Sequence, residues 1–298
     1  MSDSTHDMVR ANYGSLARVR PGADASAFTR IAASFGYSAE DLGAIPAEAN
    51  LGVSCGNPVA LASLEPGETV LDLGCGGGLD VFLAAEKVGP EGHVIGLDMT
   101  PDMIALARAN AMRRGDTNVT FIEAPIEAMP LPDESVDCVI SNCVLNLVPD
   151  KSAAYAEIFR VLRPGGRLAV SDIALKQALP EPLRTSVTAW VGCIAGALTA
   201  AESQAALAAA GFVDIAIIDA EADLNVYKEA GQDGCCAPPA AQTGSCCAPM
   251  QATSCCSPSK TSGGELHAEM GSVFKDIDIN AYAASVKIFA LKPAGKAD

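Results

Sequence analysis

Short apolar segments alternate with amphipathic segments through the middle of the chain. Apolar residues dominate five segments, at 70–73, 93–97, 119–123, 136–140 and 167–172, which predicts five buried strands. Helical spacing predicts helices at 79–88, at 100–115 and at 151–162, the first ended by Gly89 and the last by Arg163-Pro164-Gly165-Gly166. Strands that alternate with helices predict a parallel sheet covered by helices on both faces.

The pattern loosens after Asp172. Residues 182–198 and 201–210 have helical patterns, while 211–218 and 284–291 have the pattern of a sixth and a seventh strand. The predicted fold class is therefore α/β, with a doubly wound, mostly parallel seven-stranded Rossmann-like sheet and N-terminal helices.

One segment has a different composition. Residues 231–264 contain Gly, Ala, Pro, Ser, Thr and Cys, with no aromatic or branched aliphatic residue, so they cannot build a core and are predicted to be disordered. This change predicts four parts of the chain: an N-terminal helical segment at 1–48, a core at 49–228, a flexible segment at 229–264, and a C-terminal helix with the last strand of the core at 265–298.

Charge narrows the choice of partners. The net charge of −16 over 298 residues argues against nucleic acid and anionic membranes. No apolar run reaches the length of a membrane span, and residues 1–10 lack the apolar stretch of a secretory signal. We therefore expect a cytoplasmic protein, and a monomer.

The eleven cysteines are unevenly distributed, and a cytoplasmic protein keeps them mostly as thiols. Five are scattered, and six form the adjacent pairs Cys235-Cys236, Cys246-Cys247 and Cys255-Cys256. None of the three histidines lies near a cysteine and no CxxC spacing occurs, which argues against a zinc site.

The first predicted strand runs into the glycine-rich sequence DLGCGGG at 72–78, directly before a helix. Glycines at this position allow a tight turn and a close approach of the backbone to a ligand. Asp98 ends the second strand, where a carboxylate accepts hydrogen bonds from both ribose hydroxyls of either a dinucleotide or an adenosine cofactor. The Gly-x-Gly-x-Gly order and Asp72, which suits an ammonium group, favour S-adenosylmethionine over NAD. The alternative role of Asp72 is to cap the turn, and Cys75 is most simply a small filler within this cofactor-binding turn.

Cys143 closely follows the fourth predicted strand. Cys138 lies within that strand and is predicted to be a small buried apolar residue. Ligands of an open α/β sheet bind at the carboxyl ends of its strands. A thiol at position 143 therefore faces whatever the glycine turn holds, as a nucleophile or as a ligand for a soft metal.

Three cysteine motifs are more specific than the glycine turn: SNCVLNLVPDK at 141–151, ANLGVSCGNP at 49–58 and WVGCIAGAL at 190–198. With them, the chain resembles the arsenite methyltransferase family of class I S-adenosylmethionine-dependent methyltransferases, over residues 8–220 and again over 276–293. The resemblance implies a methyltransferase sheet with Cys143 and Cys193 as arsenic ligands, and Cys55 as a third ligand or as a partner in a disulfide relay. It also implies a cofactor site formed by Asp72, Gly74, Cys75, Gly76, Asp98, Met99, Ile126, Glu127 and Asn142, with Asp98 on the ribose and Ile126 and Glu127 against the adenine.

The implied chemistry suits the residues. Trivalent arsenic is soft and prefers thiolate ligands, as soft metal ions do. Two thiolates from different elements would hold arsenic with its lone pair aimed at the sulfonium methyl group, and no strong general acid is needed because a neutral thioether leaves.

One departure from the family concerns the reductant. Family members carry a further cysteine upstream of the Cys55 position, but this chain has none between residues 1 and 54. The reductant is then expected to be a small thiol such as glutathione, a thioredoxin-type protein, or the paired cysteines at 235, 236, 246, 247, 255 and 256. Those pairs either capture arsenite for the core or belong to a tolerated insertion.

Two other functions stay open on the sequence. One is methylation of a different small molecule, such as a quinone or a sterol precursor. The other is arsenite sequestration by a methyltransferase domain that has lost its activity.

Overall fold

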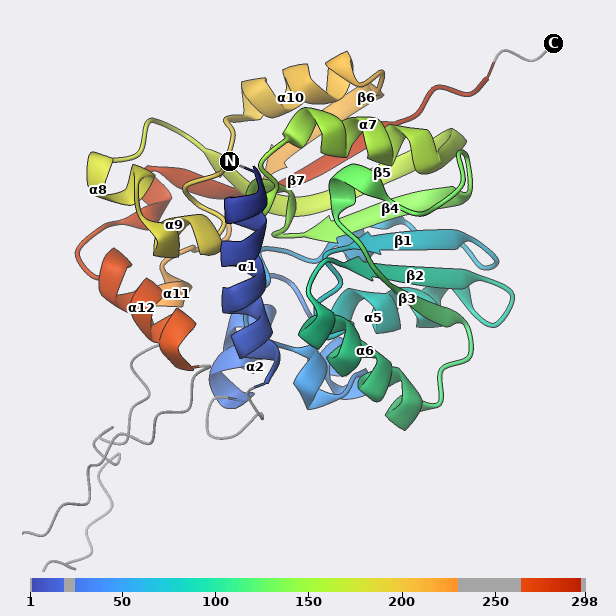
Figure 1. Cartoon of the computed structure of the whole chain (residues 1–298), viewed down its shortest axis with the longest axis horizontal. Coiled ribbons are helices and arrows are strands. Elements are labelled where there is room, and N and C mark those ends of the chain that lie inside the picture. Colours follow the sequence, from blue (N-terminus) through green and yellow to red (C-terminus); the bar gives the residue numbers. More distant parts are fainter. Residues whose placement is uncertain (1, 19–24, 230–263, 296–298) are drawn as a thin grey trace, which may run out of the picture.

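The computed structural model describes residues 2–18, 25–229 and 264–295, and its centre is a seven-stranded sheet (Figure 1). The strand order is β3-β2-β1-β4-β5-β7-β6, and β7 runs antiparallel to both β5 and β6 while β1 to β5 are parallel. The strands are β1 Thr69–Leu73, β2 His93–Asp98, β3 Val119–Glu123, β4 Val136–Asn142, β5 Leu162–Leu175, β6 Val213–Asp219 and β7 Ala283–Leu291. The predicted α/β class, with seven strands in a mostly parallel sheet, is confirmed.

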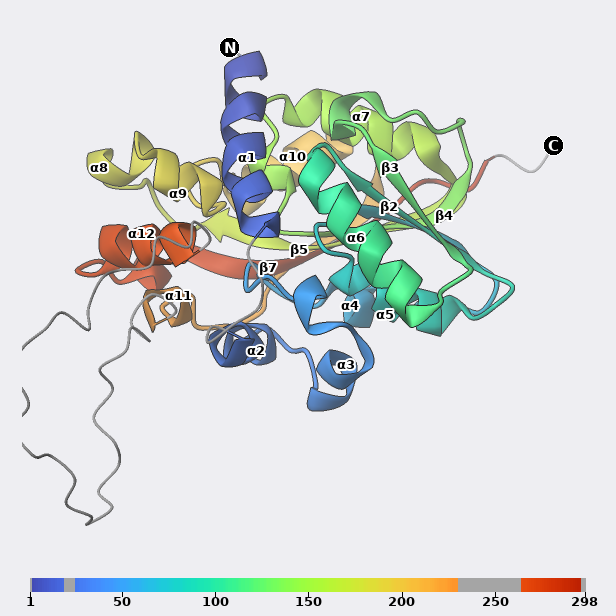
Figure 2. The ribbon, with the colours of Figure 1, turned by 60° about the horizontal axis from the view of Figure 1, so that its bottom comes forward.

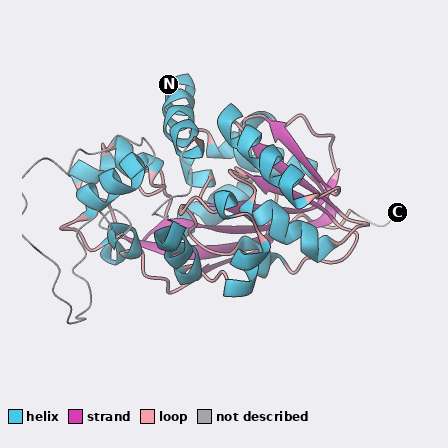
Figure 3. Ribbon diagram, turned by 90° about the horizontal axis from the view of Figure 1, so that it is seen from below, coloured by secondary structure: helices cyan, strands magenta, loops and turns pink. Residues whose placement is uncertain are grey.

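Helices cover both faces of the sheet, as Figures 2 and 3 show. They are α1 Ser2–Ala17, α2 Ala25–Ser34, α3 Ala39–Ala44, α4 Pro58–Ala62, α5 Leu79–Val88, α6 Pro101–Arg114, α7 Lys151–Val161, α8 Glu181–Arg184, α9 Val187–Val191, α10 Ala200–Ala209, α11 Val226–Glu229 and α12 Gly264–Phe274. Buried residues of α4, α5 and α6 form one hydrophobic cluster with the sheet, and those of α7 and α10 form another on the opposite face. Burial of this apolar surface is what fixes the layers.

A third hydrophobic cluster lies beyond the carboxyl ends of the strands. It joins α1, α9, α11 and α12 to the segments that carry Cys55, Cys143 and Cys193. Figure 1 shows α1 standing between the strands and the group formed by α8, α9 and α12. The thiols of the predicted site are therefore enclosed by elements from both ends of the chain.

Two local predictions are wrong. Residues 182–198 do not form one helix, because Ser186 accepts a hydrogen bond from the Ala189 N–H and begins a new helix, α9, which stops at Val191. Cys193 thus lies in a turn rather than on a helix. Strand β5 begins at Leu162, directly after α7, and so includes residues 163–166, which were expected to lie between the helix and the strand.

No helix of the described residues is long and apolar enough to cross a membrane. The four-part division of the chain remains a prediction, and its flexible segment at 229–264 falls almost wholly outside the described residues.

Candidate active site

The glycine turn connects β1 to α5. Gly74, Gly76 and Gly78 have φ angles of +65°, +50° and +95°, which residues with a side chain rarely adopt. The Gly74 and Cys75 N–H groups both donate to the Leu97 carbonyl oxygen, at 2.7 and 3.0 Å, so the turn is anchored to the end of β2. The backbone at Gly74 also packs directly against Val144, where a Cβ atom would overlap that side chain.

We expect Gly74→Ala to weaken cofactor binding by about tenfold or more and to destabilise the fold by about 3 kcal/mol, because it adds a steric overlap to an unfavourable φ. Gly67→Ala is the matched control: Gly67 has a φ of +87° but nothing within 4 Å of its would-be Cβ. That control should lose only about 1 kcal/mol and keep wild-type cofactor affinity. Calorimetric titration with the methyl donor and denaturant unfolding measure both effects, and equal behaviour of the two variants would contradict the role of the turn.

A cavity of ≈ 720 Å³, counted with the open space at its mouth, lies at the carboxyl ends of the strands. Eight of the residues predicted for the cofactor or for arsenic line it: Gly74, Gly76, Asp98, Met99, Ile126, Glu127, Asn142 and Cys143. Asp72 and Cys75 line a smaller adjoining pocket, together with Gly74, Gly76 and Asn142.

Asp98 is anchored at the end of β2. Its two carboxylate oxygens accept one N–H each, from Gly76 at 3.1 Å and from Thr100 at 2.8 Å. Burial raises the pKa of Asp98, and these hydrogen bonds oppose the shift. Because each oxygen has further acceptor capacity, the carboxylate can still accept hydrogen bonds from a pair of ligand hydroxyls.

The smaller pocket is also lined by Asp80, which sequence reasoning missed together with its hydrogen-bond partner Tyr37. The Tyr37 hydroxyl donates to Asp80 at 2.7 Å, and the Asn142 amide donates to Tyr37 at 2.8 Å and to Asp80 at 3.1 Å. Burial raises the pKa of Asp80 to about 6 and that of Asp72 well above its ordinary value. Two buried acids beside one pocket suit a cationic group such as an ammonium. Asp80 could have been found from the sequence, because it is an acidic residue at the second position of the mostly apolar helix α5. The sequence around Tyr37 carries no such signal.

Helix α1 covers the cavity. His6 and Tyr13 line it, the His6 ring hydrogen-bonds the Glu127 carboxylate at 3.0 Å, and Arg10 donates to the Met99 carbonyl oxygen at 3.3 Å. The N-terminal segment therefore contacts the residues predicted to hold the adenine end of the cofactor, which the sequence did not indicate.

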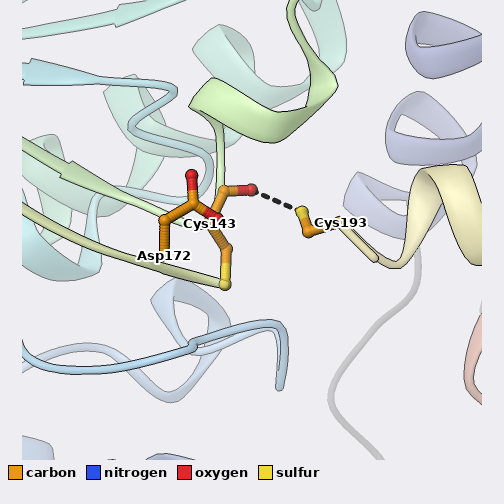
Figure 4. Close-up of side chains that lie close together, drawn as sticks. All are labelled: Cys143, Asp172 and Cys193. Carbon is orange, nitrogen blue, oxygen red and sulfur yellow. Dashed lines mark hydrogen bonds between the residues drawn. The ribbon is translucent and has the colours of Figure 1, made fainter. Parts of the chain in front are cut away.

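The three predicted thiols come together beside the cavity, which Cys143 lines. The sulfurs of Cys55 and Cys143 lie at bonding distance, with their Cα atoms 5.6 Å apart, as in a disulfide. The ligand atoms of Cys143, Cys193 and Asp172 all lie within 4.8 Å of one another, and all three residues are buried. Figure 4 shows the Cys193 sulfur directed at the Cys143 carbonyl oxygen, to which it donates at 2.6 Å.

Both cysteines have backbone conformations that are unusual for a side-chain-bearing residue. The φ angle is +56° at Cys143 and +63° at Cys193. Such conformations cost of the order of 1–3 kcal/mol and persist mainly at functional sites. Cys138, by contrast, lies within β4 with no exposed surface, as expected for a small apolar residue.

Burial raises the pKa of the Cys193 thiol well above its ordinary value, and the nearby Asp172 raises it further. The resting group is therefore a thiol rather than a thiolate. A second small pocket reaches this thiol and Cys55, and Tyr13, Tyr227 and Met270 form part of its wall. The six paired cysteines lie outside the described residues.

Comparison with known proteins agrees with this geometry. The chain is 46% identical to the arsenite methyltransferase of Halobacterium salinarum over 204 residues, which are 64% of this chain and 52% of that protein. It is 38% identical to the demethylmenaquinone methyltransferase of Listeria welshimeri over 112 residues, 38% of this chain and 48% of that protein. Among solved structures, an arsenic(III) S-adenosylmethionine methyltransferase from Chlamydomonas reinhardtii matches with a TM-score of 0.52 and 26% identity, over 93% of this chain and 75% of that one.

The chain spans about half the length, or less, of the curated relatives it matches. A family model described as a methyltransferase domain matches residues 64–231, which is more than half of the 298 residues and includes the glycine turn, Cys143 and Cys193. With the strand order of the sheet, this match shows that the chain belongs to the methyltransferase domain family.

Proposed function

We propose that the protein transfers the methyl group of S-adenosylmethionine to trivalent arsenic. The observation that carries this proposal is the convergence of Cys143 and Cys193, each in a left-handed backbone conformation, with Cys143 also lining the cofactor cavity. The similarity to arsenite methyltransferases supports the same substrate.

Arsenite binding needs no preformed thiolate. Arsenous acid, As(OH)₃, can condense with the Cys143 and Cys193 thiols: two As–S bonds form, and each thiol proton leaves with a hydroxide as water. The protonated Cys193 thiol, whose pKa burial raises, is therefore competent. Cys55, next to Cys143, is available as a third ligand.

The cofactor cavity supplies the second half of the reaction. We assign the ribose hydroxyls to Asp98, the adenine to Ile126 and Glu127, and the ammonium group to Asp72 with Asp80 and Tyr37. Met99 and Asn142 complete the lining, and Cys75 supports the turn from the smaller pocket. When bound, S-adenosylmethionine supplies an activated methyl group on a sulfonium.

Transfer is an in-line displacement in which the arsenic lone pair forms the As–C bond and the sulfonium C–S bond breaks. Holding both partners in attack geometry lowers the barrier by about 7–11 kcal/mol. Arsenic is oxidised from the +3 to the +5 state, so returning it to +3 takes two electrons. We assign these to Cys55 and Cys143, which supply them by closing to a disulfide, and a thiol reductant of the glutathione or thioredoxin type then reopens it.

The direct test incubates the full chain with arsenite, a thiol reductant and methyl-labelled cofactor. We expect labelled methylarsenicals. A parallel incubation with demethylmenaquinone tests the alternative that the chain methylates a quinone, as the name of the Listeria relative suggests. Label found only on the quinone would overturn the proposal. Thiol-dependent arsenite binding without any transfer would instead indicate sequestration.

The paired cysteines are proposed to capture arsenite for the core. The described residues that flank them on either side belong to α11 and α12, which place Tyr227 and Met270 at the small pocket beside Cys55 and Cys193. Arsenite released there would enter next to its binding thiols.

Replacing all six paired cysteines by serine should raise the KM for arsenite by about tenfold and leave kcat unchanged, because only capture is removed. Initial rates across a range of arsenite concentrations measure this. Unchanged rates at low arsenite, in this variant or after deletion of residues 231–264, would contradict capture.

Cytoplasmic location and a monomeric state are further proposals, which rest on the acidic charge and the thiol-rich sequence. Light scattering on the reduced protein tests the second, and a defined dimer would contradict it.

A further inference from the structure

Asn146 connects the three segments that surround the thiols. It lies in a single turn, Leu145–Leu147, between β4 and α7, and only 5% of its surface is exposed. The two hydrogens of its side-chain amide are shared among three acceptors, Asp172 at 2.8 Å, the Ile173 carbonyl oxygen at 2.7 Å and the Cys193 carbonyl oxygen at 3.1 Å. One side chain thereby ties the turn after Cys143 and the turn containing Cys193 to the end of β5.

Asp172 is suited to holding Asn146 rather than to binding arsenic. Its carboxylate accepts the Asn146 side-chain amide, the Asn146 backbone N–H at 3.3 Å and the Ile173 N–H at 2.8 Å. Although it lies within 4.8 Å of both sulfurs, these three donors occupy most of its acceptor capacity. Its hydrogen bonds therefore fix the orientation of Asn146.

Backbone hydrogen bonds tie the Cys193 turn to the end of α9, but not to the segment that carries Cys143. The Cys193 N–H donates to the Trp190 carbonyl oxygen at 2.9 Å, and the Ile194 and Ala195 N–H groups donate to the Ala189 carbonyl oxygen at 3.0 and 2.9 Å. The turn also packs on Asn146: Gly196 lies so close that a Cβ there would overlap the Asn146 carbonyl oxygen. Since Cys193 has an unfavourable φ of +63°, the contacts with Asn146 help to set where its thiol lies relative to Cys143.

We propose that Asn146 is a positioning residue that holds the Cys193 turn against Cys143, so that the two thiols are set for bidentate binding before substrate arrives. The inference rests on the proposed function, because it assigns the pair to arsenic. Its physical basis is effective concentration: once the first As–S bond has formed, the second depends on how well the other thiol is presented. Loosening the turn should weaken two-thiol ligands while leaving one-thiol reactions intact.

Two variants approach the contact from opposite sides. Asn146→Ala removes the three donated hydrogen bonds, whereas Gly196→Ala keeps them available but pushes the turn away by steric overlap. Asn118→Ala is the matched control, since the Asn118 amide also joins two backbone carbonyls, of Ala85 and Gly89, far from the thiols. If Asn146→Ala does not fold, Gly196→Ala still tests the proposal.

Two measurements on the reduced full chain test the proposal. The first is the rate at which a short bifunctional alkylating reagent bridges Cys143 to Cys193, followed by mass spectrometry of the bridged peptides. The second is the arsenite Kd, read from the fluorescence of Trp190, the only tryptophan in the sequence. We expect both variants to bridge about tenfold more slowly and to bind arsenite about tenfold more weakly, with no slowing of Cys193 alkylation by a monofunctional reagent. The control should match wild type.

Wild-type bridging rates in both variants would overturn the proposal. The bridging assay uses no arsenic, so it separates this inference from the function on which it rests. If the variants bridge slowly while the wild type shows no thiol-dependent arsenite affinity, the positioning role of Asn146 is supported and the assignment of the thiol pair to arsenic is wrong.

Discussion

Replacing Cys143 or Cys193 by serine is expected to lower arsenite methylation by about a thousandfold or more. A serine hydroxyl is a hard, weak ligand for arsenic, and loss of one ligand removes both the affinity and the alignment that bring the lone pair to the methyl group. The rate of label transfer from the methyl donor to arsenic measures the effect. Cofactor affinity should stay within about threefold of wild type, because neither thiol is assigned to the cofactor.

Cys138→Ala provides the control for this prediction. Cys138 is fully buried in β4 but takes no part in the proposed site, so its loss should cost about 1 kcal/mol of unfolding free energy and leave methylation intact. If the Cys143 and Cys193 variants methylated arsenite as fast as this control, the two-thiol site would be wrong.

Asp98→Ala is expected to weaken methyl-donor binding by about 30-fold or more. The change removes a charged acceptor for two ligand hydroxyls, each such hydrogen bond contributing about 1.5–3 kcal/mol, and it releases the Gly76 N–H that the carboxylate holds. Calorimetric titration with the cofactor, or with its demethylated product, measures the loss directly.

Asp137→Ala is the matched control for Asp98. The Asp137 carboxylate accepts a backbone N–H from Thr69 at 2.8 Å, near the start of β1 and so at the opposite end of the strands from Asp98. The control removes a carboxylate, a backbone hydrogen bond and an ion pair with Arg163, and cofactor affinity should not change. Equal losses of cofactor affinity in the two variants would show that Asp98→Ala weakens binding only because it destabilises the fold.

Local periodicity was sufficient to predict the sheet. Helix α5 begins and ends where the apolar spacing and Gly89 predict, because nearly all of its residues are buried, and β3 has the predicted bounds. Strand β5 extends beyond its prediction because pairing with β7 continues the ladder to Leu175. Tertiary pairing of this kind has no local signal.

The site was predicted only in part. Cys143 could be placed because it follows a strand, and Asp98 because it ends one. The turn at Cys193 was mistaken for a helix, since its apolar residues pack against α12 and α1 and give the same composition as a helix face. Tyr37, Asn146 and the cover formed by α1 escaped notice because each acts across a long sequence separation, such as the 121 residues between His6 and Glu127.

X-ray absorption at the arsenic edge tests the central claim most directly. The sample is the reduced full chain with arsenite bound, in a variant whose six paired cysteines are serine, so that only core thiols contribute. Two or three sulfur neighbours around arsenic are expected, with at least one lost in Cys193→Ser. An all-oxygen shell, or a sulfur shell unchanged by that substitution, would contradict a site built from Cys143 and Cys193.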